Sequence, residues 1–215
     1  MKAVVIGASG ATGKALIARL LNNEAYTQVV AILRKQSLEQ HPKLQQVIVN
    51  FSDMENVSDS IKGDVAFSCL GTTLKAAGSK EGQWKVDYEY QLKFAEIARR
   101  NNIPVFCLVS AKGASANSRF FYYKMKGRLD EAIRTLQFQK TVIFRPGVLV
   151  RPESDRRFEK VFVKIADFFN RLGLLKSLKS TQVDTLAAAL INSQHVVQDK
   201  YTILEVNEIH KITKT

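Results

Sequence analysis

The sequence predicts an α/β fold: a doubly wound, Rossmann-like parallel sheet with helices on both faces. Two observations lead to this prediction. Short, near-continuous apolar runs recur along the 215 residues, as expected of strands covered on both faces. They alternate with longer segments of helical periodicity, which is the arrangement of βαβ units. No repeat or Pro/Gly/Ser-rich linker divides the chain, so residues 1–215 are expected to form a single domain.

Each element follows from its local pattern. Six apolar runs are interpreted as the first six strands, at residues 3–6, 28–33, 46–49, 64–70, 104–109 and 141–145. Helical periodicity is found at residues 15–21, 92–98, 125–136 and 183–190. In the third of these segments Met125, Leu129 and Ile133 form one apolar stripe. A final strand is expected at residues 201–206.

The composition is that of an ordinary globular protein. A chain of this length buries about 70% of the surface that it exposes when unfolded, so it needs neither a metal nor a disulfide. Cys69 and Cys107 lie in apolar runs and are too few for a disulfide scaffold or a structural zinc site. No uncharged stretch approaches the roughly 20 residues of a membrane span. We therefore expect a cytoplasmic protein without a metal centre.

The chain is strongly basic, with 32 Lys and Arg against 20 Asp and Glu and a net charge of +12. Nucleic acid, acidic lipid and a phosphorylated small molecule are all compatible with such a charge. Nucleic acid is disfavoured, because the aromatic residues gather on an apolar stripe and do not interleave with the cations. A small-molecule substrate is therefore the expected partner.

A glycine loop is the strongest motif. Gly7, Gly10 and Gly13 form a G-x-x-G-x-x-G pattern directly after the first strand. Glycines in this position permit a tight turn and a close approach of the backbone to a pyrophosphate at a helix N-terminus. A nucleotide-hydrolase loop is excluded by the spacing and by Ala15, which follows Lys14 where Ser or Thr is required. The predicted cofactor-binding residues of the loop are Gly7, Ser9, Gly10, Ala11, Thr12 and Gly13.

The end of the second strand indicates which dinucleotide is bound. Arg34 and Lys35 stand where a site selective for NAD places an acidic residue on the ribose 2′-hydroxyl. Two cations suit a 2′-phosphate, so NADP(H) is preferred, and NAD(H) is the alternative if the two side chains are merely solvated. Asp53, beyond the third strand, is predicted either to accept a hydrogen bond from adenine or to cap a short helix.

The catalytic candidates follow the fifth strand. Tyr122 and Lys126 are four residues apart, so they share one face of a helix. An ammonium beside a phenol lowers the phenol pKa from about 10 toward working pH, which makes it a usable general acid or base. Ser110, twelve residues before Tyr122, offers a hydroxyl for a substrate carbonyl oxygen. Tyr123 points about 100° away on the helix and is interpreted as a packing residue.

These motifs together resemble the short-chain dehydrogenases/reductases, in the atypical branch with a G-x-x-G-x-x-G loop. Within that branch the chain looks most like the small Tat-interacting-protein-type oxidoreductases. The resemblance implies active-site roles for Ser110, Tyr122 and Lys126. The positions that it places along the cofactor are Leu70, Gly71, Thr72, Tyr122, Lys126, Pro146 and Gly147. The typical branch has a further catalytic Asn, which this sequence lacks, and Asp87 is present instead.

The function hypothesis is an NADP(H)-dependent oxidoreductase that reduces a carbonyl, or oxidises an alcohol, of an unidentified small molecule. The alternative is an NADP(H)-sensing regulatory protein with little or no turnover. Extended epimerases share the loop and the Tyr-Lys pair but carry a larger carboxyl-terminal part. Only about 70 residues follow the sixth strand here, which disfavours a nucleotide-sugar substrate.

Residues 151–180 are both aromatic and basic and are interpreted as an inserted helical cover near the active site. Within them, residues 158–178 have an apolar helical stripe and several cations. Such a helix could lie on an acidic membrane. We favour a cover over the pocket or a homodimer face, because a wide apolar stripe requires burial.

Overall fold

The computed structural model describes residues 1–150 and 181–213. The strands of the main sheet are β1 (Lys2–Ile6), β2 (Gln28–Leu33), β3 (Leu44–Ile48), β4 (Val65–Ser68), β5 (Val105–Val109), β6 (Lys140–Arg145) and β9 (Tyr201–Glu205). The helices are α1 (Ala11–Leu21), η1 (Phe51–Ser60), α2 (Leu74–Ala77), α3 (Lys80–Trp84), η2 (Lys85–Glu89), α4 (Tyr90–Arg100), α5 (Phe121–Thr135), α7 (Val183–Val196) and α8 (Val206–Ile212). Two short strands, β7 (Leu149–Val150) and β8 (Thr181–Gln182), pair with each other.

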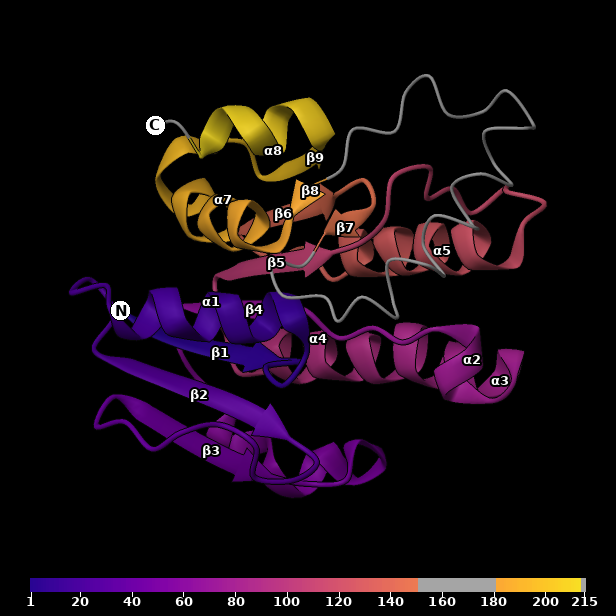
Figure 1. The fold of residues 1–215 in the computed structure, drawn as a ribbon. Coiled ribbons are helices and arrows are strands. Elements are labelled where there is room, and N and C mark those ends of the chain that lie inside the picture. The colour runs from indigo at the N-terminus through magenta and orange to yellow at the C-terminus, as the bar shows by residue number, and fades with distance from the viewer. Residues whose placement is uncertain (151–180, 214–215) are drawn as a thin grey trace.

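The seven strands form one parallel sheet in the order β3-β2-β1-β4-β5-β6-β9 (Figure 1). The chain runs outward from β1 to β3, then returns to the other side of β1 and continues from β4 to β9. The strand order therefore reverses between β1 and β4, the place where open α/β sheets bind ligands at their carboxyl edge. The predicted doubly wound fold is confirmed.

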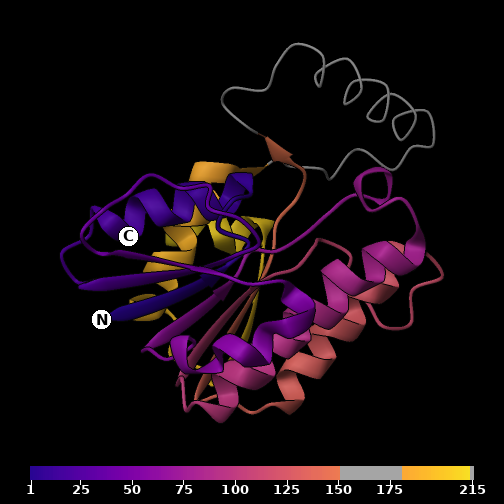
Figure 2. The same cartoon turned by 90° about the horizontal axis from the view of Figure 1, so that it is seen from below.

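Helices cover both faces of the sheet, so the molecule has three layers (Figure 2). On one face α1, α7 and α8 bury residues such as Leu16, Leu190 and Ile209 against the sheet. On the other face η1, α4 and α5 bury Phe94 and Leu129 among others. The central strands lie between two apolar layers, which explains why their sequences are continuous apolar runs and do not alternate.

The edges of some elements differ from the sequence-based expectation. β3 begins at Leu44, two residues before the predicted start. It is an edge strand beside β2, and it includes the exposed polar residue Gln45, which an apolar run does not reveal. β4 ends at Ser68, so Cys69 and Leu70 belong to the loop that follows, although their run is apolar. Apolar character marks burial, and Cys69 and Leu70 are half-buried although they lie outside the strand.

The loops at the carboxyl edge are tied to one another by backbone hydrogen bonds. The Cys69 N–H donates to Ile6 O at 3.0 Å, which joins the ends of β4 and β1. The Ser110 N–H donates to Phe144 O at 2.7 Å, and the Lys112 N–H donates to Pro146 O at 3.0 Å. These bonds join the ends of β5 and β6, so the segments that carry the predicted site form one continuous surface.

The predicted aromatic cover at 151–180 lies outside the described residues. Within 1–150 and 181–213, the helices are all too short or too polar to cross a bilayer.

We predict that Gly127→Ala destabilises the protein. Gly127 lies inside α5, and a Cβ there would be 2.1 Å from the Ser115 carbonyl carbon and 2.2 Å from the Ala116 nitrogen. Alanine gains about 1 kcal/mol of helix propensity, but overpacking against a backbone costs more. We expect a net loss of about 2 kcal/mol in the free energy of unfolding, measured by urea denaturation. Glu131→Ala, on the exposed side of α5, is the control and should change stability by less than about 0.5 kcal/mol.

Candidate functional site

The glycine loop approaches the loop after β4 so closely that side chains would not fit. Gly7 has a φ of +79°, and a Cβ there would be 2.5 Å from the Cys69 carbonyl carbon. A Cβ on Gly13 would be 2.2 Å from Gly7 O. The Gly10 N–H closes the turn by donating to Gly7 O at 3.0 Å. Glycine is therefore required at Gly7 for its backbone angle and at Gly13 for space.

The loop leads into the N-terminus of α1, which is suited to a diphosphate. Gly10 occupies the N-cap position without a capping side chain, and Ser9 and Gly10 are exposed. The first amide N–H groups of a helix have no partners within the helix, and the helix dipole favours negative charge there. Ala11, Thr12 and Gly13 are the residues that contribute these N–H groups. The residues present thus fit the phosphates of a dinucleotide.

The side chains predicted to bind the adenosine half lie beyond β2 and β3. Arg34 and Lys35 are exposed at the carboxyl end of β2, and the Arg34 guanidinium stacks 5.8 Å from the centroid of the Phe51 ring. Asp53 is exposed within η1, whose N-cap is Asn50, with its side chain accepting a hydrogen bond from the Ser52 N–H. Asn50 caps the start of η1, and Asp53 lies at a kink inside it, with a φ of −106° and a ψ of 25°. The adenine-binding and helix-capping interpretations of Asp53 both stay predictions.

Asp87 connects the loop after β4 to the opposite wall of the site. The residue is 2% exposed and lies in η2, a π-helical turn within the helical stretch from Lys80 to Arg100. Its carboxylate accepts a hydrogen bond from the Thr72 N–H at 2.9 Å. Its other oxygen would be 3.4 Å from a Cβ on Gly71. The predicted cofactor residues Leu70, Gly71 and Thr72 are thus held against η2.

Lys126 lies on α5 on the far side of Asp87, and its ammonium is buried. Lys126 Nζ donates to Val109 O at 3.2 Å and lies 3.9 Å from Asp87 Oδ1, with only 3% of each side chain exposed. Burial lowers the pKa of Lys126, and the Asp87 and Asp130 carboxylates oppose this. Burial raises the pKa of Asp87, whereas the Lys126 charge and the hydrogen bond from the Thr72 N–H lower it. Lys126 and Asp87 are both removed from water, and their opposite charges offset each other.

Tyr122 stands one helical turn before Lys126, as predicted, but its electrostatics differ from the expectation. Burial of the hydroxyl raises its pKa, and the negative charges of Asp87 and of an ionised Tyr123 add to this. The expected lowering of the Tyr122 pKa by Lys126 is wrong, because the Asp87 carboxylate compensates the charge of the ammonium and burial disfavours a phenolate. Tyr123 is 38% exposed, as Tyr122 is, and its ring packs edge-on against the rings of Phe120 and Tyr122.

Ser110 follows β5 and is 5% exposed. Neither Ser110 Oγ nor Asp130 Oδ1 has a hydrogen-bond partner in the part of the chain that the structure describes. The two groups lie close enough for the hydroxyl to lower the pKa of Asp130, although burial raises it more. The other Asp130 oxygen accepts two hydrogen bonds from the Arg145 guanidinium, at 2.9 and 3.0 Å. A buried hydroxyl without a partner is available to a ligand oxygen.

Pro146 and Gly147 follow β6 and are adjacent to this group. Pro146 is buried, and its carbonyl oxygen accepts the Lys112 N–H, so the segment is attached to the loop that begins at Ser110. The three predicted catalytic residues and the predicted cofactor residues of 70–72 and 146–147 thus lie around the ends of β4, β5 and β6. Arg34, Lys35 and Asp53 lie apart from them, beyond β2 and β3, on the other side of β1 in the strand order.

Sequence reasoning missed one residue of this group, Asp130. Asp130 is four residues after Lys126 and therefore on the same face of α5, a signal that the spacing contained. Arg145 ends β6, and its contact with Asp130 depends on how α5 packs on the sheet. Asp87 was noted only as a departure from the typical pattern, and its contact with Lys126 required the three-dimensional fold.

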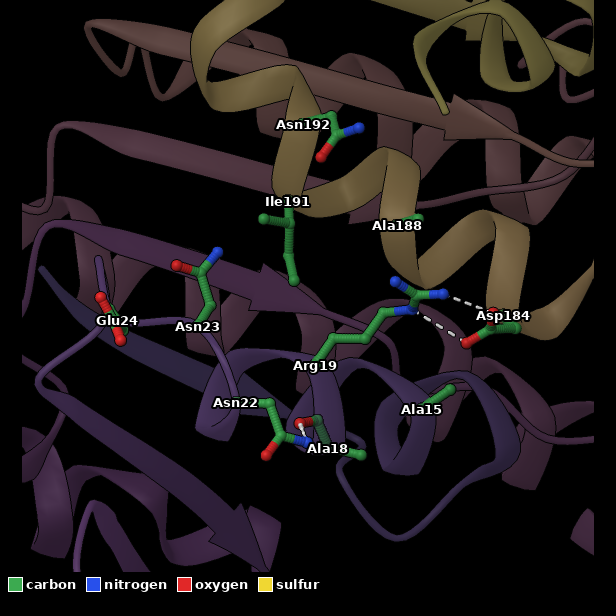
Figure 3. A pocket seen from close by; sticks show the side chains of 10 residues that line it. All are labelled: Ala15, Ala18, Arg19, Asn22, Asn23, Glu24, Asp184, Ala188, Ile191 and Asn192. Carbon is green, nitrogen blue, oxygen red and sulfur yellow. Dashed lines mark hydrogen bonds and ion pairs between the residues drawn. The ribbon is translucent and has the colours of Figure 1, made fainter. Parts of the chain in front are cut away.

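A surface groove of about 780 Å³ lies elsewhere, between α1 and α7 (Figure 3). Ala15 and Arg19 of α1 face Asp184 and Ile191 of α7 across it, and Arg19 forms an ion pair with Asp184. It contains none of the predicted catalytic or cofactor-binding residues. The 1–150 and 181–213 segments also contain no cluster of His, Cys, Asp or Glu that could hold a metal ion.

Comparison with known proteins identifies the family. The NAD(P)H-binding family matches residues 7–169. The chain belongs to this family. HTATIP2 of Rattus norvegicus is 35% identical over 157 residues, which cover 71% of this chain and 64% of that protein. FMP52, a mitochondrial protein of Eremothecium gossypii, is 32% identical over 222 residues, which cover 100% of this chain and 98% of that protein. The resemblance to HTATIP2-like atypical short-chain dehydrogenases/reductases is confirmed.

Solved structures agree on the fold of this NAD(P)H-binding protein. MoeE5, in complex with UDP-glucose and NAD, aligns over 99% of this chain and 81% of its own with a TM-score of 0.74 and 14% identity. The human epimerase family protein SDR39U1, with NADPH, aligns over 96% of this chain and 74% of its own with a TM-score of 0.63 and 16% identity. At these identities the likeness establishes the Rossmann-like architecture.

We predict that Lys126→Met destabilises this protein in a pH-dependent way. Removing one partner of a buried ion pair costs about 3 kcal/mol. Without the ammonium, the Asp87 pKa rises further above its ordinary value of 3.8, so the folded state holds a proton that the unfolded state releases. The stabilisation from that proton is lost as pH rises through the raised pKa. The loss of unfolding free energy should therefore be larger at pH 7 than at pH 4.

Urea denaturation at both pH values measures this loss. Lys124→Met, an exposed lysine two residues earlier on α5, is the matched control and should lose little at either pH. Equal losses for Lys126→Met at the two pH values would contradict a charge pair between Lys126 and Asp87.

Proposed function

We propose that the protein is an NADP(H)-dependent oxidoreductase that reduces the carbonyl group of a small molecule. One observation carries the proposal: Asp87, which holds the loop at 70–72, also contacts Lys126, one turn from Tyr122 on α5. The cofactor loop and the candidate proton donor are thereby parts of one site. Membership of the NAD(P)H-binding family supports a nicotinamide cofactor.

The residues at the carboxyl edge have complementary tasks in this proposal. The glycine loop and the N-terminus of α1 bind the diphosphate, and the segments at 70–72 and 146–147 line the nicotinamide half. When bound, NADPH supplies a hydride to the carbonyl carbon. Ser110 Oγ, which is buried and has no hydrogen-bond partner of good geometry within residues 1–150 and 181–213, donates a hydrogen bond to the carbonyl oxygen. This hydrogen bond polarises the carbonyl and fixes its orientation.

Tyr122 transfers the proton that balances the hydride. Burial and Asp87 raise its pKa, so its hydroxyl stays protonated near neutral pH and serves as an acid in the direction of reduction. The proton passes from Tyr122 Oη to the carbonyl oxygen, which leaves an alcohol and a transient phenolate. The Lys126 ammonium stabilises that phenolate electrostatically. In the reverse direction the same groups oxidise an alcohol.

The cofactor preference rests on Arg34 and Lys35. Both are exposed beyond β2, where the ribose of the adenosine half would lie. Cations and a 2′-phosphate form charge-assisted hydrogen bonds that a 2′-hydroxyl does not match. A cytoplasmic location and a homodimer remain expectations. Imaging of the tagged protein tests the first against a mitochondrial location, because the FMP52 relatives are named mitochondrial.

We predict that Tyr122→Phe abolishes most carbonyl reduction and leaves cofactor binding intact. The variant lacks the proton donor but keeps the ring, so turnover should fall about 100-fold or more while the Kd for NADPH changes little. Turnover is measured by NADPH consumption over a panel of aldehydes and ketones, and Kd by calorimetry.

Tyr123→Phe is the matched control, because Tyr123 is adjacent and equally exposed. If both variants reduce substrate as well as the wild type, Tyr122 is not the acid. Tight NADPH binding by the wild type, with no consumption over the whole panel, would instead favour the cofactor-sensing function.

We also predict that Arg34→Ala weakens NADPH binding selectively. Loss of a charge-assisted hydrogen bond to the 2′-phosphate should raise the Kd for NADPH about tenfold, while the Kd for NADH stays the same. Calorimetry with both cofactors measures the change, and Lys62→Ala, which removes an exposed cation outside the site, is the control. Equal affinities of the wild type for the two cofactors would count against an NADP(H) preference.

A further inference from the structure

The π-helical turn η2 gives Asp87 its place in the site. A π-helical turn inserts an extra residue into an α-helix, and such turns are common at functional sites. The Asp87 backbone is anchored as well as its side chain: Gln91 Nε2 donates to Asp87 O at 2.9 Å, and Ser68 Oγ donates to Gln91 Oε1 at 2.9 Å. Ser68 ends β4, so the turn is attached to the sheet through two buried side chains.

We propose that Asp87 is a positioning residue, which holds the Lys126 ammonium beside Tyr122 and couples it to the cofactor loop at 70–72. This inference rests on the proposed function, in which Lys126 stabilises the Tyr122 phenolate. It extends that function by assigning a task to a buried carboxylate between the two halves of the site.

Among the residues that the structure describes, two carboxylates act on Lys126, and their surroundings distinguish them. Asp130, on α5 itself, accepts both of its hydrogen bonds from the guanidinium of Arg145, which compensates its charge. Asp87, on η2, accepts its hydrogen bond from the neutral Thr72 N–H. In the described part of the chain, Lys126 is the cation that pairs with the Asp87 carboxylate, at 3.9 Å. Asp87, more than Asp130, is the counter-charge that keeps a buried ammonium protonated.

The same carboxylate connects this charge to the cofactor-binding loop. Its two oxygens contact different polar groups: Oδ2 accepts the Thr72 N–H, and Oδ1 faces Lys126 Nζ. Oδ1 also lies against Gly71, where a Cβ would be only 3.4 Å away. A shift of the loop would therefore move the carboxylate relative to the ammonium. Asp87 makes the position of Lys126 depend on the loop that lines the nicotinamide half.

The test is a titration of Lys126 in wild type and in Asp87→Asn. The asparagine keeps the shape and still accepts the Thr72 N–H, but it lacks the charge. NMR of the full chain with ¹³C- and ¹⁵N-labelled lysines follows Nζ, and Lys126→Arg assigns its signal. We expect the Lys126 pKa to fall by about one pH unit or more in Asp87→Asn. Asp59→Asn, a distant and exposed charge change, should leave it unaltered.

Activity provides the second measurement. Because the ammonium is lost at lower pH in Asp87→Asn, the basic limb of the kcat profile should move to lower pH by the same amount, with little change in KM for NADPH. Asp87→Glu, which restores a carboxylate, should return the limb toward its wild-type position. A merely structural Asp87 would lower activity equally at all pH values.

Failure of the role proposed for Asp87 and failure of the proposed function would give different results. An unchanged Lys126 pKa in a folded Asp87→Asn variant, or a larger fall in Asp130→Asn, would overturn the role of Asp87 whatever the activity. Absence of carbonyl reduction by the wild type would overturn the proposed function, and the NMR titration does not depend on turnover.

Discussion

The close contact between the loop after β1 and the loop after β4 is the constraint on which the site depends. It requires a backbone without a side chain at Gly7, where a Cβ would be 2.5 Å from the Cys69 carbonyl carbon. The contact brings the N-terminus of α1 beside the segment at 70–72, at the point where the strand order reverses. The same segment donates the Thr72 N–H to Asp87. A single close approach thus joins the proposed phosphate-binding end of the site to its proposed catalytic end.

Charge burial is the second constraint, and it acts against stability. Asp87, Lys126 and Asp130 are each 2% exposed, and burial shifts the pKa of each toward its neutral form. Replacing such groups with apolar residues is often neutral or stabilising, so burial of three charges indicates a task other than holding the fold together. Paired charges in a water-poor site act strongly on a neighbouring phenol, because the local dielectric response is weak. The arrangement is consistent with the proton transfer that we propose at Tyr122.

Much of this could be predicted from residue order. The apolar runs at 28–33 and 141–145 predicted strands whose ends differ from the structure by at most one residue. The glycine spacing predicted a dinucleotide loop, and the i, i+4 spacing placed Tyr122 and Lys126 on one helix face. The end of β4 could not be predicted, because Cys69 and Leu70 are as apolar as the strand before them. The contact of Lys126 with Asp87 could not either, since 39 residues and two elements separate them in the sequence.

By itself, the sequence determined the alternation of strands and helices, the sign of the charge beyond β2 and the glycine loop. These features arise from local periodicity and from backbone freedom at particular residues, which a linear pattern records. Only the tertiary structure decided the protonation preference of Tyr122, the pairing of Asp87 with Lys126 and the coupling of Asp130 to Arg145. A pKa depends on burial and on every charge within several ångströms, and those distances exist only once the helices have packed on the sheet.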